Sequence, residues 1–169
     1  MFTMLSQKLA RAFYPYHSIR KVLFGAIKGA KYVVEPGMGI SYAFGVGNTY
    51  FSFFIKKLKH GMIVYDIGAN RGQMSLFFSK YVGNEGHVVA VEPVPSLYES
   101  LTKNISINNI LNVTSVCAAG SDKNGSITFS FNPERSTKGR IVHDSIKNYD
   151  PVSQIMIQFH KIFKLIVSS

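Results

Sequence analysis

Within residues 62–91, two short continuous apolar runs flank a segment whose apolar residues recur at helical spacing. Residues 62–67 form a short apolar run rich in β-branched side chains, and the glycine-containing stretch that follows permits a tight turn. A second apolar run covers residues 87–91. Between the two runs, large apolar residues recur at helical spacing, at Met74, Phe77, Phe78, Tyr81 and Val82. This order predicts a strand, a turn, a helix and a second buried strand.

The same alternation continues after Glu92. Pro95 and the capping-box pair Ser96 and Glu99 predict the start of a second helix, which is expected to end near Asn108. Its apolar face holds Leu97, Leu101 and Ile105. Residues 113–119 predict a third core strand. Together these elements predict an α/β fold with a Rossmann-like sheet.

The flanking segments give weaker patterns. In the first 60 residues we expect helices over 4–13 and 19–27, short strands over 31–34 and 40–44, and a helix capped by Asn48. The stripe of that last helix is Phe51, Phe54, Ile55 and Leu58, and Gly61 is expected to end it.

Beyond the third strand, the pair Asn124 and Gly125 predicts a turn, and the alternation of residues 126–131 predicts a returning hairpin strand. Asp150 and Pro151 predict the start of a final helix. Its expected apolar stripe is Ile155, Phe159, Ile162 and Ile166.

The turn between the first strand and the first helix carries the candidate chemistry. A pyrophosphate-binding turn needs the spacing G-x-G-x-x-G, but here Asn70 stands between Gly68 and Gly72, and Asp66 precedes the first glycine by two residues. Glu92 ends the second strand, where a Rossmann-like sheet binds a ribose diol. This pattern favours S-adenosylmethionine, which carries an ammonium, a carboxylate and a ribose diol but no phosphate.

In this interpretation Asp66 faces the methionine ammonium directly or through water, the turn amides line the amino-acid and ribose portion, and Glu92 accepts both ribose hydroxyls. Arg71 has two alternatives, contact with an anionic group of a ligand or exposure to solvent. A turn without cofactor and a site for a nicotinamide or flavin nucleotide also remain open.

These segments resemble the FkbM-type S-adenosylmethionine-dependent methyltransferases. The likeness covers residues 19–131 and is carried by four motifs: residues 65–72, residues 89–93, the pair Asn104 and Asn108, and residues 118–125. It implies methyl transfer to a hydroxyl of a sugar or small natural product. It also implies cofactor contacts from Ala69, Pro93, Asn108 and Asp122, in addition to Asp66, Gly68, Asn70, Gly72 and Glu92. A cap or turn role for Asn104 and Asn108, and a simple loop acid for Asp122, remain alternatives. No catalytic base can be named.

After residue 131 we expect the likeness to end, because the Asp-x-Glu-Gly segment of the family has no match here. The chain is therefore expected to have three parts: a leader (1–60), a cofactor-binding core (61–131) and a divergent or truncated segment (132–169). Such a core would leave a sheet edge that a partner chain, an oligomer or the final helix must cover. A cofactor-binding remnant without catalysis is a further alternative.

Composition and charge limit the expected number of domains, the cellular compartment and the classes of partner. The 169 residues suffice for one domain, and the single cysteine, Cys117, suits a cytoplasmic protein and is expected to be a buried structural thiol. No apolar run is long enough for a membrane helix, and the five histidines have no metal-ligand spacing. The formal net charge of +10 keeps an RNA methyltransferase open, but the lysines are scattered, so nucleic acid is the less favoured partner.

Overall fold

The computed structural model describes residues 14–35, 49–121, 125–130, 140–141 and 154–161. At its centre is a parallel sheet of three strands in the order β3-β4-β5. These strands are β3 (Ile63–Ile67), β4 (His87–Val91) and β5 (Val113–Val116), and they are joined by the helices α4 (Gln73–Val82) and α5 (Pro95–Ile107). The predicted α/β fold with a Rossmann-like sheet is confirmed.

Both connecting helices pack on the same face of this sheet. Val88 and Ala90 are two residues apart on β4 and therefore point to one side; Val88 packs in a cluster with residues of α4, and Ala90 in a cluster with residues of α5. Asp66 pairs with Ala90 in the register and so faces the helices as well. On the other face, Ile63 and Ile67 are 61% and 51% exposed.

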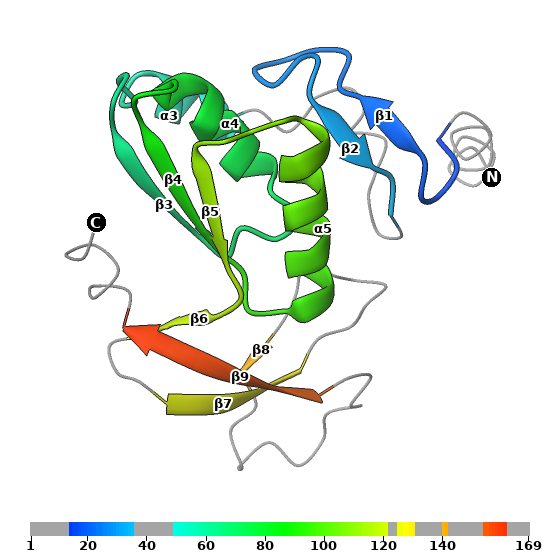
Figure 1. Ribbon diagram of the computed structural model, residues 1–169, viewed down its shortest axis with the longest axis vertical. Helices are drawn as coiled ribbons and strands as arrows, with labels where there is room; N and C mark the ends of the chain where they lie inside the picture. Colours follow the sequence, from blue (N-terminus) through cyan, green and yellow to red (C-terminus); the bar gives the residue numbers. More distant parts are fainter. Residues whose placement is uncertain (1–13, 36–48, 122–124, 131–139, 142–153, 162–169) are drawn as a thin grey trace.

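The leader forms a hairpin that packs against α5. Strands β1 (Ile19–Lys21) and β2 (Lys31–Val33) pair antiparallel, and Figure 1 shows α5 between this hairpin and the parallel sheet. The strand over residues 31–34 was predicted, but the helix over 19–27 is wrong. Gly25 and Gly29 have φ values of 79° and 90°, which are incompatible with a continuous helix through these residues.

The predicted helix after position 48 is confirmed as α3 (Thr49–Ile55), but it ends before Leu58, so the expectation that Gly61 ends it is wrong. Helix α5 begins at Pro95 with Val94 as N-cap, and no side chain caps it. The expected capping box is therefore wrong, because Ser96 lies inside the helix, where its carbonyl accepts a hydrogen bond from Ser100.

A second sheet follows the carboxyl end of β5 (Figure 1). The predicted third strand is shorter than expected: β5 ends at Val116, and the chain then enters β6 (Ala119–Ser121) in the second sheet. Cys117, between the two strands, is exposed, so the expectation of a buried thiol is wrong. The strand order of the second sheet is β6-β9-β7-β8, with β7 (Gly125–Ser130), β8 (Arg140–Ile141) and β9 (Gln154–Lys161).

Strand β9 corrects two predictions. Residues 154–161 form a strand and not a helix, because Ile155, Ile157 and Phe159 also alternate with period two and β9 pairs on both of its edges. Strand β7 exists as predicted, but it pairs antiparallel with β9 and β8, so it is not the return strand of a hairpin with β6. The helix expected over 4–13 and the strand expected over 40–44 lie outside the described residues. The start of the helix expected after Asp150 also lies outside them.

Candidate functional site

The candidate site lies at the carboxyl ends of β3 and β4. The two strands are parallel and in register, with Ile67 opposite Val91, so Glu92 and the turn after Ile67 come to the same edge of the sheet. Ligands of Rossmann-like sheets bind outside this edge. The structure therefore brings together the two carboxylates and the turn that the sequence singled out.

The turn of residues 68–72 has three residues in left-handed conformations. The φ values are 80° for Gly68, 53° for Asn70 and 86° for Gly72. A Cβ at Gly72 would lie 2.6 Å from Cδ1 of Leu101, so this glycine allows α5 to approach the turn. No heavy atom lies within 4 Å of a Cβ built at Gly68, which leaves space beside the turn at this position.

All five N–H groups of residues 68–72 donate hydrogen bonds within the protein. Gly68 and Ala69 donate to the carbonyl of Val91 (2.8 and 3.0 Å), and Gly72 donates to that of Ala69 (2.8 Å). The N–H of Asn70 donates to Oε2 of Glu92 (2.7 Å), and that of Arg71 donates to Oδ1 of Asn70 (2.9 Å). The turn amides thus face the protein, and a ligand that needs several N–H donors from this turn is disfavoured.

Glu92 is the residue that closes the turn. It is 4% exposed, and its two carboxylate oxygens accept from two backbone N–H groups, Oε2 from Asn70 and Oε1 from Val94 (3.0 Å). Each oxygen of a carboxylate can accept more than one hydrogen bond. Glu92 can therefore accept hydroxyl groups of a ligand while it holds the turn and the start of α5 in place.

Asp66 lies below the first turn of α4. Its Oδ2 accepts a hydrogen bond of 2.6 Å from the Ser75 hydroxyl, and its side chain also lines a cavity of about 660 Å³ beside β3. The cavity is mostly apolar, and its other lining residues include Phe51, Phe54, Leu58, Met74 and Phe78. Lys57, Tyr65 and Gln73 also line it, so Asp66 adds a carboxylate to a wall that is mostly but not entirely apolar.

Both carboxyl groups have raised pKa values. Burial is the main cause for Asp66, against which the Ser75 hydrogen bond acts. Burial is also the main cause for Glu92, and the negative charge of Asp66 adds to it. The two backbone N–H bonds and the charge of Arg71 lower the pKa of Glu92 but do not cancel the effect of burial.

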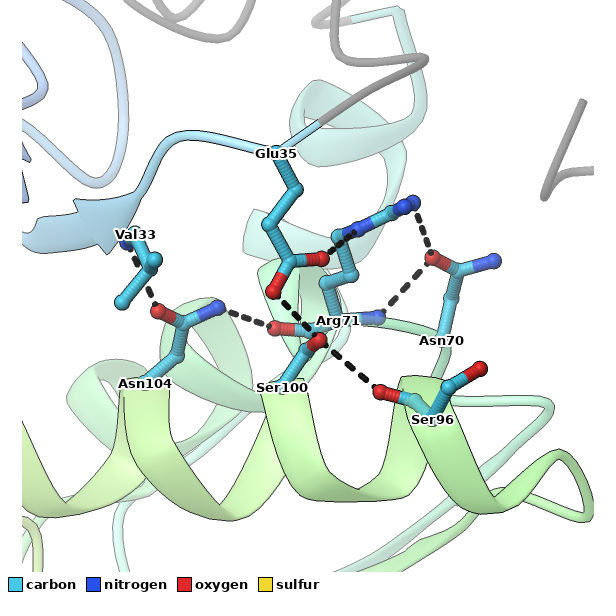
Figure 2. A network of polar contacts seen from close by, with 7 residues as sticks. All are labelled: Val33, Glu35, Asn70, Arg71, Ser96, Ser100 and Asn104. Carbon is cyan, nitrogen blue, oxygen red and sulfur yellow. Dashed lines mark hydrogen bonds and ion pairs between the residues drawn. The ribbon is translucent and has the colours of Figure 1, made fainter. Parts of the chain in front are cut away.

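Arg71 is buried in a network that neither of its expected alternatives described. It is 5% exposed, and its Nε lies 2.6 Å from Oε2 of Glu35, in the leader. The other carboxylate oxygen of Glu35 accepts from the Ser100 hydroxyl (2.7 Å), and the Arg71 carbonyl accepts from Nδ2 of Asn104 (2.9 Å). Figure 2 shows these side chains converging from the leader, the turn and α5.

The remaining predicted residues have different surroundings. Ala69 is buried in the core with Leu101, and Pro93 is half-buried. The Asn108 side chain bonds both backbone groups of Lys31 in the leader, accepting from its N–H (2.7 Å) and donating to its carbonyl (2.8 Å), and it also donates to the Asn104 carbonyl in α5 (2.7 Å). Asp122 lies outside the described residues.

Sequence reasoning missed Glu35, Ser75 and Ser100. One signal was present for the first of them: Glu35 is the only acidic residue before Asp66, in a stretch with nine lysines and arginines, and it directly follows a predicted strand. A single carboxylate at such a place favours a specific basic partner. Ser75 and Ser100 carried no comparable signal, since serine is common on helix surfaces.

Comparisons with known proteins agree with this geometry. The sequence model of one protein family, the methyltransferase FkbM domain, matches residues 66–166, a span that covers more than half of the chain. The chain belongs to the FkbM methyltransferase family. The predicted family and its cofactor, S-adenosylmethionine, are thereby confirmed. The match continues well past residue 131, where the likeness was expected to end.

Individual relatives also match parts of the chain. Protein-L-isoaspartate O-methyltransferase 1 of Arabidopsis thaliana is 30% identical over 105 residues, which are 59% of this chain and 44% of that protein. A solved protein-L-isoaspartate O-methyltransferase is 32% identical with a TM-score of 0.41, over 42% of this chain and 23% of its own. A S-adenosylmethionine-dependent methyltransferase from Aquifex aeolicus is 27% identical with a TM-score of 0.37, over 38% and 36%. This chain therefore spans less than half the length of these relatives.

Two kinds of feature are absent from the residues that the structure describes. No helix among them combines the length and the apolar character needed to cross a membrane. Within the same residues, histidine, cysteine, aspartate and glutamate form no group of three that could bind a metal ion.

Proposed function

We propose that this FkbM-family chain binds S-adenosylmethionine at the carboxyl ends of β3 and β4. The observation that carries this proposal is the balance of donors and acceptors. The N–H groups of the turn already donate within the protein, whereas Asp66 and Glu92 offer carboxylate oxygens. A ligand with an ammonium and a ribose diol needs such acceptors, whereas a pyrophosphate is itself anionic and would be repelled by two neighbouring carboxylates.

The residues fit distinct parts of this ligand. Asp66, at the wall of the cavity, is suited to the ammonium, and Glu92 to the two ribose hydroxyls. The open side of Gly68 permits close approach of a ligand to the backbone. When bound, S-adenosylmethionine supplies a methyl group on a positively charged sulfur.

Calorimetry with S-adenosylhomocysteine and with NAD⁺ tests the binding proposal. We expect binding heat with S-adenosylhomocysteine and none with NAD⁺, and we expect Asp66→Asn and Glu92→Gln to weaken the binding. Heat with NAD⁺ alone would identify a nicotinamide site and contradict the proposal. An equal affinity of wild type and both variants would show that the ligand binds elsewhere.

We further propose that the methyl acceptor is a hydroxyl of a sugar or small metabolite. Family membership supports methyl transfer, and similarity to a protein-L-isoaspartate O-methyltransferase of a plant supports oxygen as the accepting atom. Transfer from a sulfonium is an in-line displacement: the methyl–sulfur bond breaks as the methyl–oxygen bond forms, the sulfur becomes neutral, and the hydroxyl proton passes to a general base. The protein contributes mainly by aligning the donor and acceptor and by excluding water. The apolar wall around Asp66 is suited to excluding water.

Transfer of an isotopically labelled methyl group tests the acceptor class. The panel contains sugars and small hydroxyl compounds, a peptide with an isoaspartyl residue, and RNA. Labelling of a small hydroxyl compound supports the proposal. Labelling of the peptide or of the RNA alone would replace the proposed acceptor, and donor binding without transfer to any compound would favour a binding protein over an enzyme.

A further inference from the structure

Strand β2, with the two residues that follow it, and helix α5 are joined by a polar ladder of three rungs. Asn108 bonds both backbone groups of Lys31, Asn104 accepts from the N–H of Val33 (3.0 Å), and Ser100 donates to Glu35. The three helical residues are spaced by four, and their three partners by two. We use the name polar ladder for these six residues.

The spacing of the ladder follows from backbone geometry. Four residues of an α-helix advance about 6 Å along its axis, and two residues of a strand advance about 6.6 Å. Side chains at every fourth helical position therefore stay in step with every second strand position. The strand and the helix run in opposite directions, so the last rung, Ser100 with Glu35, lies at the end of α5 nearest the carboxyl ends of the sheet strands.

At that end the ladder holds Arg71 by two different groups. Glu35 accepts from the side-chain Nε, and Asn104, which is 0% exposed, donates to the backbone carbonyl. A buried guanidinium needs a counter-charge, and Glu35 supplies one directly. The side-chain direction and the backbone of Arg71 are thereby fixed together.

Arg71 in turn fixes the side chain of Asn70, the neighbouring residue of the turn. Its backbone N–H and its guanidinium Nη1 both bond Oδ1 of Asn70 (2.9 and 3.4 Å), so the Nδ2 of Asn70 points away from Arg71 (Figure 2). The N–H of Asn70 then donates to Glu92. A continuous path of hydrogen bonds thus runs from Glu35 through Arg71 and Asn70 to the carboxylate proposed to bind the ribose.

We infer that Glu35 is a positioning residue of the cofactor site: through Arg71 and the polar ladder, the leader hairpin fixes the conformation of residues 70–71 and the orientation of Glu92. Glu35 itself touches no ligand in this arrangement. The inference rests on the proposed binding of S-adenosylmethionine, but the order that Glu35 imposes on the turn exists without any ligand.

The first experiment measures hydrogen exchange of the Asn70 and Arg71 amides in the ligand-free protein. We expect faster exchange in Glu35→Ala than in wild type, because the turn loses its anchor. Two matched controls loosen other contacts: Ile27→Val removes a methylene from the buried packing of the leader, and Asn112→Ala removes the bonds of a half-buried amide at the opposite end of the sheet. Both should leave exchange at residues 70–71 unchanged.

The second experiment measures the affinity for S-adenosylhomocysteine by calorimetry at a temperature where every variant is folded. Glu35→Ala should weaken binding about tenfold or more, the effect expected for a lost charge-assisted hydrogen bond, while the two controls stay within about twofold. Because Glu35 acts through Arg71, adding Glu35→Ala to Arg71→Ala should have little further effect. If Glu35→Ala does not fold, Glu35→Gln, which keeps the shape and removes the charge, takes its place.

The outcomes separate this inference from the proposed function. Normal affinity and normal exchange in the Glu35 variants would overturn the positioning role and leave the binding proposal intact. Faster exchange in a protein whose wild type binds no S-adenosylhomocysteine would overturn the binding proposal and leave Glu35 as an anchor of the turn alone. Equal loss of affinity in the controls and in Glu35→Ala would reduce Glu35 to a general contribution to stability.

Discussion

At each end of the parallel sheet, a side chain bonds backbone groups of the segments that connect strands and helices, but the two side chains differ. At the amino end, the Asn112 amide accepts from the Ser79 hydroxyl (2.6 Å) and donates to the Gly83 carbonyl (2.8 Å), which ties the end of α4 to the start of β5. At the carboxyl end, the carboxylate of Glu92 closes the turn and the start of α5. At both ends a side chain bonds backbone groups, but Asn112 is half-buried and neutral whereas Glu92 is buried and carries a charge.

This difference indicates where function resides. A neutral amide satisfies a turn at little cost, whereas a buried carboxylate loses hydration, as the raised pKa values of Asp66 and Glu92 show. Placing two such groups next to each other adds repulsion between like charges. A fold that needed only a closed turn would be served by the amide, so the carboxylates favour a ligand with positive and hydroxyl groups.

The largest expected effect is that of Glu92→Gln on ligand binding. Glutamine keeps the size of the side chain but replaces one acceptor with an amide donor, which would face a backbone N–H that now donates to Glu92. We expect affinity for S-adenosylhomocysteine to fall about 100-fold, because hydrogen bonds to both the turn and the ribose are weakened. Calorimetry measures the loss, and an unchanged affinity would remove Glu92 from the site.

The matched change at the amino end is Gly86→Ala. A Cβ there would lie 2.7 Å from the Met62 carbonyl oxygen and 2.5 Å from Cβ of Val82, so the backbone must shift. We expect the free energy of unfolding to fall by about 1–3 kcal/mol, as in other overpacked sites, with no change in ligand affinity for the folded protein. Urea unfolding and calorimetry check the two parts. A large loss of affinity would show that the two ends are coupled.

Asp66→Asn separates binding from stability within the carboxyl end. Asparagine can still accept from the Ser75 hydroxyl, so the packing is kept while the buried charge is removed. We expect about a tenfold loss of affinity for S-adenosylhomocysteine, since its ammonium loses a charged partner. Thermal stability of the ligand-free protein at neutral pH should stay equal or rise. A fall in stability with unchanged affinity would assign Asp66 a structural role only.

The central elements were predictable because local and tertiary signals agree there. The apolar runs at β3 and β4 and the helical stripe of α4 have the period of the structure that they form, and glycines separate them. The carboxyl-end location of Asp66 and Glu92 then follows from parallel pairing alone. This is the part of the site that sequence reasoning found.

The errors arose where a pattern fits two periods. Residues 19–27 have apolar positions compatible with a helix, but Gly25 and Gly29 turn the chain and antiparallel pairing with β2 decides the outcome. In β9, Ile155 and Phe159 satisfy both the helical spacing and the alternation of a strand, and pairing with β6 and β7 selects the strand. Such pairing partners are distant in sequence, so a local pattern cannot reveal them.

The polar ladder was unpredictable for a related reason. The spacing of Ser100, Asn104 and Asn108 by four was visible, but asparagines near a helix end usually indicate a cap or turn. Their partners lie in the leader, 65 to 77 positions away. The partners of these three residues are determined only by the packing of the hairpin on α5, which a local pattern does not contain.

The smallest expected effect is a dependence on pH that has opposite signs for folding and for binding. A carboxyl group whose pKa is raised in the folded state binds its proton more tightly there, so protonation favours folding. Stability therefore falls as pH rises, over a window that begins at the ordinary pKa values of 3.8 for Asp66 and 4.5 for Glu92 and ends at their raised values. Affinity for S-adenosylhomocysteine should rise over the same window, because the ammonium pairs with the ionised carboxylate.

Urea unfolding at a series of pH values, for wild type and Asp66→Asn, isolates this contribution, because the other titrating groups are common to both proteins. The fall in stability with pH should be shallower in Asp66→Asn, and the rise in affinity smaller. A steeper fall in the variant would mean that the Asp66 carboxylate stabilises the ligand-free fold. The contrast between a neutral amino end and a charged, ligand-binding carboxyl end would then lose its energetic basis.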